Sequence, residues 1–177
     1  MGRYIALTGT PGTGKTSAAR ELRGRLASFE VWDFARRHQA ARRGATAWVV
    51  DLAKTSRWIR EHSPSQPTLL VGHLAHFLPV REVIILRCRP DLLMDRLRSG
   101  RRGTGVGRRE NAIAEAIDII LVESRGSRRR VWEIDTTFSP PASVADEVER
   151  LVRERPASRT GVVDWLADRR VTEELLR

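Results

Sequence analysis

The chain has 177 residues and a formal net charge of +10, from 32 basic and 22 acidic side chains. This length suits one compact domain with a tail, and such a domain buries about 70% of its unfolded surface without disulfide or metal staples. The single cysteine, Cys88, excludes an intramolecular disulfide, and no apolar run approaches the roughly 20 residues that span a bilayer. Because the first expected strand follows the N-terminus directly, we expect no signal peptide and a cytoplasmic location without membrane attachment.

Nearly all of the basic side chains are arginines, since Lys15 and Lys54 are the only lysines. The planar guanidinium group of arginine suits phosphate and RNA backbones, so the charge favours an acidic partner. A general bias toward arginine, with the charges spread over solvated faces, explains the same composition. The charge alone leaves both interpretations open.

Apolar patterning predicts alternating strands and helices along most of the chain. Continuous apolar runs are typical of strands buried on both faces of a parallel sheet, and helices are expected where apolar residues recur at helical spacing. In the first half we expect a strand at 3–7, a helix at 14–27, a strand or its end at 29–34, an ambiguous segment at 35–47, a candidate strand at 47–51 and a helix at 52–62. In the second half we expect strands at 68–72 and 82–88, helices at 89–97 and 110–124, a strand at 130–135 and a helix over 143–155 capped by Ser143.

This alternation predicts an α/β fold in which helices cover both faces of a five-stranded parallel sheet. We expect one domain over residues 1–155 and a C-terminal tail over 156–177.

Residues 9–16 match the pattern G-x-x-x-x-G-K-[ST], the phosphate loop of P-loop NTPases, between a predicted strand and a predicted helix. The glycines let backbone N–H groups point into one concavity, and the helix N-terminus adds a positive end. Lys15 is expected to reach the β- and γ-phosphates, and the Thr16 hydroxyl to bind Mg²⁺. The spacing identifies a phosphate site but not a reaction.

Other segments narrow the class of enzyme. The chain lacks the Asn-Lys-x-Asp element of a GTPase and is too short for a helicase. Residues 98–109 are rich in glycine and arginine and have no apolar face, so we expect a mobile lid whose arginines meet the charge of a transferred phosphoryl group. The alternative is a disordered basic linker. The lid interpretation favours a small nucleoside or nucleotide kinase.

Several stretches together resemble the adenylate kinase isoenzyme 6 family, most clearly over residues 3–28 and 68–137. They are the phosphate loop, "GHLAHFLP", "RRENAIAEAIDIILVES" and "EIDTT". The resemblance implies an adenylate-kinase-like sheet with a segment that binds the nucleoside monophosphate (NMP) at about 32–51 and a lid at about 98–109. It implies transfer of the γ-phosphoryl group of Mg·ATP to AMP with weak ATPase activity. It also implies a role in small ribosomal subunit maturation, with a ribosomal protein and pre-rRNA as partners.

The resemblance also assigns residues. It implies that His73 is the catalytic histidine after the third strand and that Arg101 or Arg102 is the catalytic lid arginine. The implied ATP-binding residues are Gly12, Thr13, Gly14, Lys15, Thr16 and Ser17, of which Lys15 is also catalytic. The implied NMP-binding residues are Asp33, Arg36 and Arg37.

The chain departs from the family in two places. Val71 stands where many members have an acid two residues before the histidine, so we expect weaker ATPase activity and Mg²⁺ held by Thr16, phosphates and waters. The lid "GRRGTGVGRR" lacks the usual aromatic residue and is richer in glycine, which indicates a looser lid.

Five other residues invite an interpretation. We expect His76 to make structural hydrogen bonds rather than bind metal, Cys88 to be a packed thiol, Asp135 to form a turn and Trp165 to pack on the core. Asp51 either contacts the acceptor or ends a strand.

Two alternatives to an AMP kinase stay open. One is an assembly factor whose ATP cycle gates binding to ribosomal protein or RNA, with incidental kinase activity. The other is a kinase of the same fold for another small molecule, such as shikimate.

Overall fold

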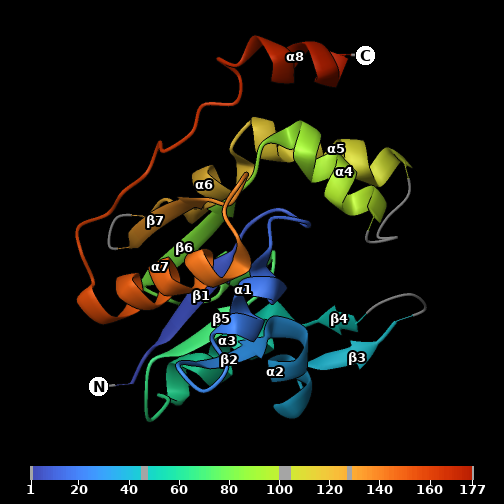
Figure 1. Ribbon diagram of the computed structural model, residues 1–177. Coiled ribbons are helices and arrows are strands. Elements are labelled where there is room, and N and C mark those ends of the chain that lie inside the picture. The colour runs from blue at the N-terminus through green and yellow to red at the C-terminus, as the bar shows by residue number, and fades with distance from the viewer. Residues whose placement is uncertain (1, 45–47, 100–104, 127–128, 177) are drawn as a thin grey trace.

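The computed structural model describes residues 2–44, 48–99, 105–126 and 129–176. Its centre is a five-stranded parallel sheet in the order β2-β5-β1-β6-β7, which confirms the predicted fold class (Figure 1). The strands are β1 (Tyr4–Thr8), β2 (Ala27–Glu30), β5 (Thr68–Val71), β6 (Glu82–Arg87) and β7 (Arg130–Asp135). All residues of β5 and β6 are buried, as expected of strands covered on both faces.

Two apolar clusters hold the helices to the sheet. On one face, α1 (Lys15–Glu21) and α7 (Pro141–Glu154) pack through residues such as Ala18 and Val148. On the other face, α2 (Val31–Arg37), α3 (Leu52–Glu61) and α6 (Ile119–Ser124) contribute Phe34, Ile59 and Leu121. The single thiol of Cys88 is buried, as predicted, and burial raises its pKa to about 11.

A separate unit is inserted between β2 and β5. It comprises α2, the short antiparallel pair β3 (Ala41–Arg43) and β4 (Trp48–Val50), and α3 (Figure 1). The ring of Trp58 lies between those of His38 and His62, with centroid distances of 3.6 and 4.3 Å, so stacking joins the ends of α2 and α3.

A second helical unit consists of α4 (Pro90–Ser99) and α5 (Gly105–Ala116), which lie above α1 and above the β3–β4 pair in the view of Figure 1. A 3₁₀ turn, η1 (Ala75–Phe77), contacts α6. After α7 the chain runs back along the sheet, where Arg159 bridges to Trp132, and ends in α8 (Arg169–Leu176). Trp165 is buried, as predicted, but it packs with Ala116 of α5 and Val171 of α8 in a small cluster separate from the two clusters on the sheet.

Several predicted boundaries were wrong. The helix expected at 110–124 is two helices, because Asp118 adopts a left-handed conformation (φ 58°) that ends α5 and starts α6. Residues 105–109, expected in the lid, are the first turn of α5.

At two other places the observed element starts or ends elsewhere. The second strand ends at Glu30, so residues 31–34 are helical. The helix predicted over 143–155 is α7, which starts at Pro141 with Pro140 as its N-cap, so Ser143 is not the cap, because proline suits the first helical turn.

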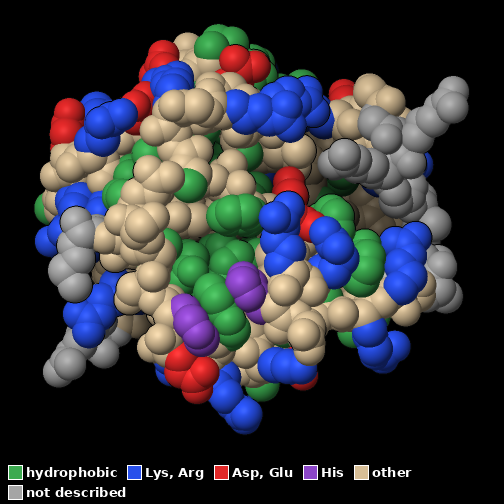
Figure 2. Space-filling model, turned by 90° about the horizontal axis from the view of Figure 1, so that it is seen from below, with side chains coloured by type: hydrophobic (Ala, Val, Ile, Leu, Met, Phe, Trp, Pro, Cys, Tyr) green, Lys and Arg blue, Asp and Glu red, His purple; other side chains and the backbone are tan. Residues whose placement is uncertain are grey.

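On the face that Figure 2 shows, the charged side chains are spread out and do not form one patch. Basic side chains lie there at several separate places around hydrophobic and histidine side chains, with acidic groups beside some of them. None of the described helices is long and apolar enough to cross a membrane.

Candidate active site

The phosphate loop connects the carboxyl end of β1 to α1. Gly9, Gly12 and Gly14 have φ angles of 139°, 98° and 96°, which L-residues with side chains rarely adopt. Gly14 is the N-cap of α1, so the loop turns directly into the helix N-terminus. This backbone forms the concavity that the spacing predicts.

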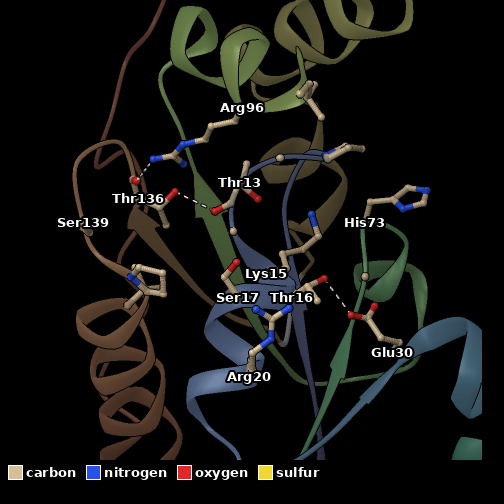
Figure 3. A pocket seen from close by; sticks show the side chains of 17 residues that line it. Thr13, Lys15, Thr16, Ser17, Arg20, Glu30, His73, Arg96, Thr136 and Ser139 are labelled. Atoms are coloured by element: carbon tan, nitrogen blue, oxygen red, sulfur yellow. Dashed lines mark hydrogen bonds between the residues drawn. The ribbon is translucent and has the colours of Figure 1, made fainter. Parts of the chain in front are cut away.

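A cavity of about 650 Å³ opens along this loop (Figure 3). Its wall comes from four parts of the chain: the loop with α1, the ends of β2 and β5, α4, and the segment from the end of β7 into the first turn of α7. The residues are Pro11, Gly12, Thr13, Gly14, Lys15, Thr16, Ser17, Arg20, Glu30, Gly72, His73, Arg96, Leu97, Thr136, Ser139, Pro141 and Val144. All six residues expected to bind ATP, and His73, therefore lie on one cavity.

The ammonium group of Lys15 lies across the loop. Its Nζ donates to the carbonyl oxygens of Gly9 and Thr10, at 2.6 and 2.9 Å. These contacts hold the cation against the loop backbone, on the wall of the cavity. The arrangement suits a phosphate group.

Thr16 and Glu30 meet at the edge of the cavity. The Thr16 hydroxyl donates to Glu30 Oε1 at 3.0 Å (Figure 3). Sequence reasoning missed Glu30, because it is the last residue of a strand whose register could not be read from the pattern. Among the described residues, no group of three histidine, cysteine or acidic side chains could hold a metal alone.

The two histidines after β5 have different environments. His73 lies on the cavity, and burial, Lys15 and His76 lower its pKa below the ordinary value. His76 is buried, with Nδ1 3.0 Å from the Thr8 hydroxyl and Nε2 3.0 Å from Glu123. The predicted structural hydrogen bonding of His76 is confirmed.

Arg96 and Thr136 form the wall opposite Glu30. Arg96 donates to the carbonyls of Thr136 and Thr137 at 2.9 and 2.8 Å, and the Thr136 hydroxyl donates to Thr13 O at 2.9 Å (Figure 3). These contacts tie α4 and the segment after β7 to the phosphate loop. Sequence reasoning missed both residues, although Arg96 comes just before the arginine-rich segment.

The expected NMP-binding residues form a group of their own on α2. Arg36 and Arg37 both donate to the carboxylate of Asp33, and these bonds lower its pKa. None of the three lines the cavity. Arg101 and Arg102, the expected catalytic lid arginines, lie outside the described residues.

Two acids play local structural roles. Asp51 is the N-cap of α3 and accepts from the Lys54 backbone N–H at 2.9 Å. Asp135 accepts from the Thr137 backbone N–H at 2.9 Å, so the predicted turn is confirmed.

Comparison with known proteins places these features in a family. Residues 5–118 match a family model described as an AAA domain. The chain is 37% identical over 164 residues to a "Putative adenylate kinase" of Thermococcus onnurineus, covering 91% of this chain and 90% of the relative. It is 36% identical over 182 residues to one of Archaeoglobus fulgidus, covering 93% and 92%.

Solved structures show the same fold. A shikimate kinase of Acinetobacter baumannii in complex with shikimate superimposes with a TM-score of 0.56 at 16% identity, covering 86% of this chain and 94% of that one. A shikimate kinase of Bacteroides thetaiotaomicron gives a TM-score of 0.51 at 14% identity, covering 87% and 99%. At such identities the likeness concerns the fold alone.

Proposed function

The chain belongs to the family of archaeal proteins named putative adenylate kinase, and from that premise we propose that it transfers the γ-phosphoryl group of ATP to AMP. Kinase activity on a nucleotide or small molecule follows from the relatives and the phosphate loop. The observation that carries the choice of AMP is the relatedness over nine-tenths of both chains.

The donor side of the cavity suits a nucleoside triphosphate. The loop glycines and the N-terminus of α1 present N–H groups to the phosphates, and Lys15 adds a cation. Catalysis of phosphoryl transfer is mainly charge neutralisation and in-line positioning, so these groups need no covalent role. We assign Gly12 to Ser17 to the triphosphate and the segment that contains Thr136 and Ser139 to the rest of the nucleotide.

Magnesium fits the Thr16 end of the cavity. The Thr16 hydroxyl lies on the cavity wall and already meets a carboxylate oxygen, and hydroxyl, carboxylate and phosphate oxygens are the ligands that Mg²⁺ prefers. Bound there with ATP, Mg²⁺ would neutralise charge on the β- and γ-phosphates.

The acceptor side is the inserted unit between β2 and β5. Its helix α2 follows Glu30, a cavity residue, and carries Arg36 and Arg37, whose guanidinium groups suit the phosphate of AMP. His73 lies on the cavity near Lys15, and its lowered pKa keeps the ring neutral at pH 7. A neutral ring there adds a hydrogen-bonding group without a further charge, which suits a positioning role.

The test is an acceptor screen. ADP formation from Mg·ATP is measured with AMP, the other nucleoside monophosphates and shikimate, with Lys15→Ala as the inactive control. We expect turnover with AMP to exceed all others. Preference for shikimate, or no turnover above the acceptor-free rate, would refute the assignment.

A second role, in maturation of the small ribosomal subunit, is supported by one surface. Trp32 is 41% exposed and stacks on Trp48 at 5.8 Å, while the Arg43 guanidinium lies 5.9 Å from the Trp48 ring. Exposed aromatic rings beside arginines suit unpaired bases, so we propose pre-rRNA, with a ribosomal protein, as the partner here.

Single-stranded RNA binding, with and without ATP, tests this role. Trp32→Ala should weaken binding, whereas Leu166→Ala, at an exposed apolar position on the tail, should not. Equal effects of the two variants count against this surface. Pull-down of ribosomal protein with and without ATP tests the ATP-gated alternative, which nucleotide-independent binding would exclude.

A further inference from the structure

We propose that Glu30 supplies the magnesium-binding acid that β5 lacks at Val71. The inference rests on the proposed function only in taking Mg·ATP as the donor. It is supported by three observations: the position of Glu30 in the sheet, its contact with Thr16 and the charges around the cavity.

The strand register places Glu30 beside the apolar position. β2 pairs with β5 in parallel, and Glu30 is the partner of Val71 at the carboxyl end of both strands. Paired residues of neighbouring parallel strands lie about 4.8 Å apart and point to the same face of the sheet. Val71 packs in the cluster that contains Ala18 of α1, so this face is the one that α1 covers. An acid at either position faces the start of α1.

The contact with Thr16 shows that Glu30 reaches the metal end of the phosphate loop. Its Oε1 accepts from the Thr16 hydroxyl at 3.0 Å, and both residues line the cavity. The glutamate chain is one methylene longer than that of aspartate, which suits a carboxylate that must reach the site from the neighbouring strand.

The charges around the cavity favour a Glu30 carboxylate that binds a metal over one that faces the phosphates directly. Among the described residues that line the cavity, Glu30 is the one acid, whereas Lys15, Arg20 and Arg96 are cations. A carboxylate beside a triphosphate raises the energy of the bound state by like-charge repulsion. A divalent cation between the carboxylate and the triphosphate attracts both, so the net interaction becomes favourable.

A glutamate that binds Mg²⁺ should make ATP binding depend on Mg²⁺, whereas a purely structural glutamate should not. ATP binding is measured by calorimetry with excess Mg²⁺ and again with EDTA, without an acceptor. In Glu30→Gln, we expect Mg·ATP to bind about tenfold more weakly, while metal-free ATP binds as tightly as to the unmodified chain or more tightly. Glu61→Gln makes the same change of charge at an exposed position on α3 and should change neither value.

A second variant places the acid on β5 in place of β2. The double substitution Glu30→Gln with Val71→Asp should restore part of the Mg²⁺ dependence of ATP binding that Glu30→Gln alone removes. The proposal is overturned if Glu30→Gln leaves the Mg²⁺ dependence of ATP binding unchanged, or weakens binding with Mg²⁺ and with EDTA by the same factor. Neither outcome bears on whether AMP is the acceptor.

Discussion

The hydroxyl of Thr10, in the phosphate loop, donates to the carboxylate of Glu115 on α5 at 2.6 Å, and both side chains are buried. The carbonyl of the same threonine accepts from Lys15 and from the backbone N–H of Thr13. Thr10 therefore holds together the first turn of the loop and fastens it to a helix that follows the expected lid. Glu115 is in turn held by Arg87 at 2.7 Å.

Removing that hydroxyl should loosen the phosphate loop. Thr10→Val keeps the shape of the side chain and leaves a buried carboxylate oxygen without its donor, so we expect ATP to bind about tenfold more weakly. Thr10→Ser keeps the hydroxyl and should bind ATP nearly as the unmodified chain does. Calorimetric dissociation constants for ATP measure both effects.

Thr68→Val is the matched control. Thr68 is equally buried, donates one hydrogen bond to Gln66 O at 3.0 Å and lies at the opposite end of the sheet from the loop. It should lower the unfolding midpoint by less than Thr10→Val does, because its partner is a neutral carbonyl and not a buried carboxylate, and it should leave ATP binding unchanged. Equal ATP affinities for the two valine variants would contradict a positioning role of Thr10.

The sheet and the phosphate loop were predictable from the sequence because both are local patterns. Residues 83–86 are apolar at every position, as expected of a strand buried on both faces. The loop is a fixed spacing of glycines before a lysine. Both patterns can be recognised without knowing the rest of the fold.

The partners of the loop were not predictable, because they meet only through tertiary packing. Glu30 reaches Thr16 through the register of β2 beside β5, and Glu115 reaches Thr10 across 105 residues of chain. The break at Asp118 was hidden for another reason. Apolar residues continue at helical spacing on both sides of it, so the pattern shows no end to the helix.

Replacing Arg87 should lower the stability of the folded chain more than most substitutions do. Its guanidinium is buried and pairs with Glu115, Glu133 and Asp118, so Arg87→Met leaves buried carboxylates without their cation. We expect a loss of about 3–5 kcal/mol in the free energy of unfolding. Arg98→Met, which breaks an exposed pair with Asp95, should cost about 0–1 kcal/mol. Urea denaturation compares them, and similar losses would refute the importance of the buried group.

Gly12 should tolerate no side chain. Its φ is 98°, and a Cβ there would lie 2.9 Å from Leu93 Cδ1 and 3.2 Å from Leu97 on α4. Gly12→Ala therefore adds crowding against the Leu93 and Leu97 side chains of α4 to backbone strain of about 1–3 kcal/mol, and these side chains must repack. We expect both stability and ATP affinity to fall.

Gly24→Ala separates strain from clash. Gly24 has a φ of 80°, but a Cβ there meets no atom within 4 Å. Urea denaturation and ATP calorimetry should show a loss of stability of about 1–2 kcal/mol with unchanged ATP affinity. If Gly12→Ala is no more harmful than Gly24→Ala, the contact with α4 does not restrict the loop.

The buried His76 should make the folded state sensitive to mild acid. Burial lowers its pKa below the ordinary 6.5, against the opposing effect of Glu123, so the folded chain takes up a proton less readily than the unfolded chain. Stability is therefore present above about pH 6.5 and falls as the pH drops toward the folded-state pKa, by at most about 1.4 kcal/mol per pH unit for one proton. The pKa values of His38 and His73 are lowered as well, so the contribution of His76 must be isolated by substitution.

The variant His76→Gln can still form a hydrogen bond with Thr8 but cannot titrate. Its free energy of unfolding should therefore fall less between pH 7.5 and 5.5 than that of the unmodified chain. Parallel curves for the two proteins would show that His76 does not carry this pH dependence.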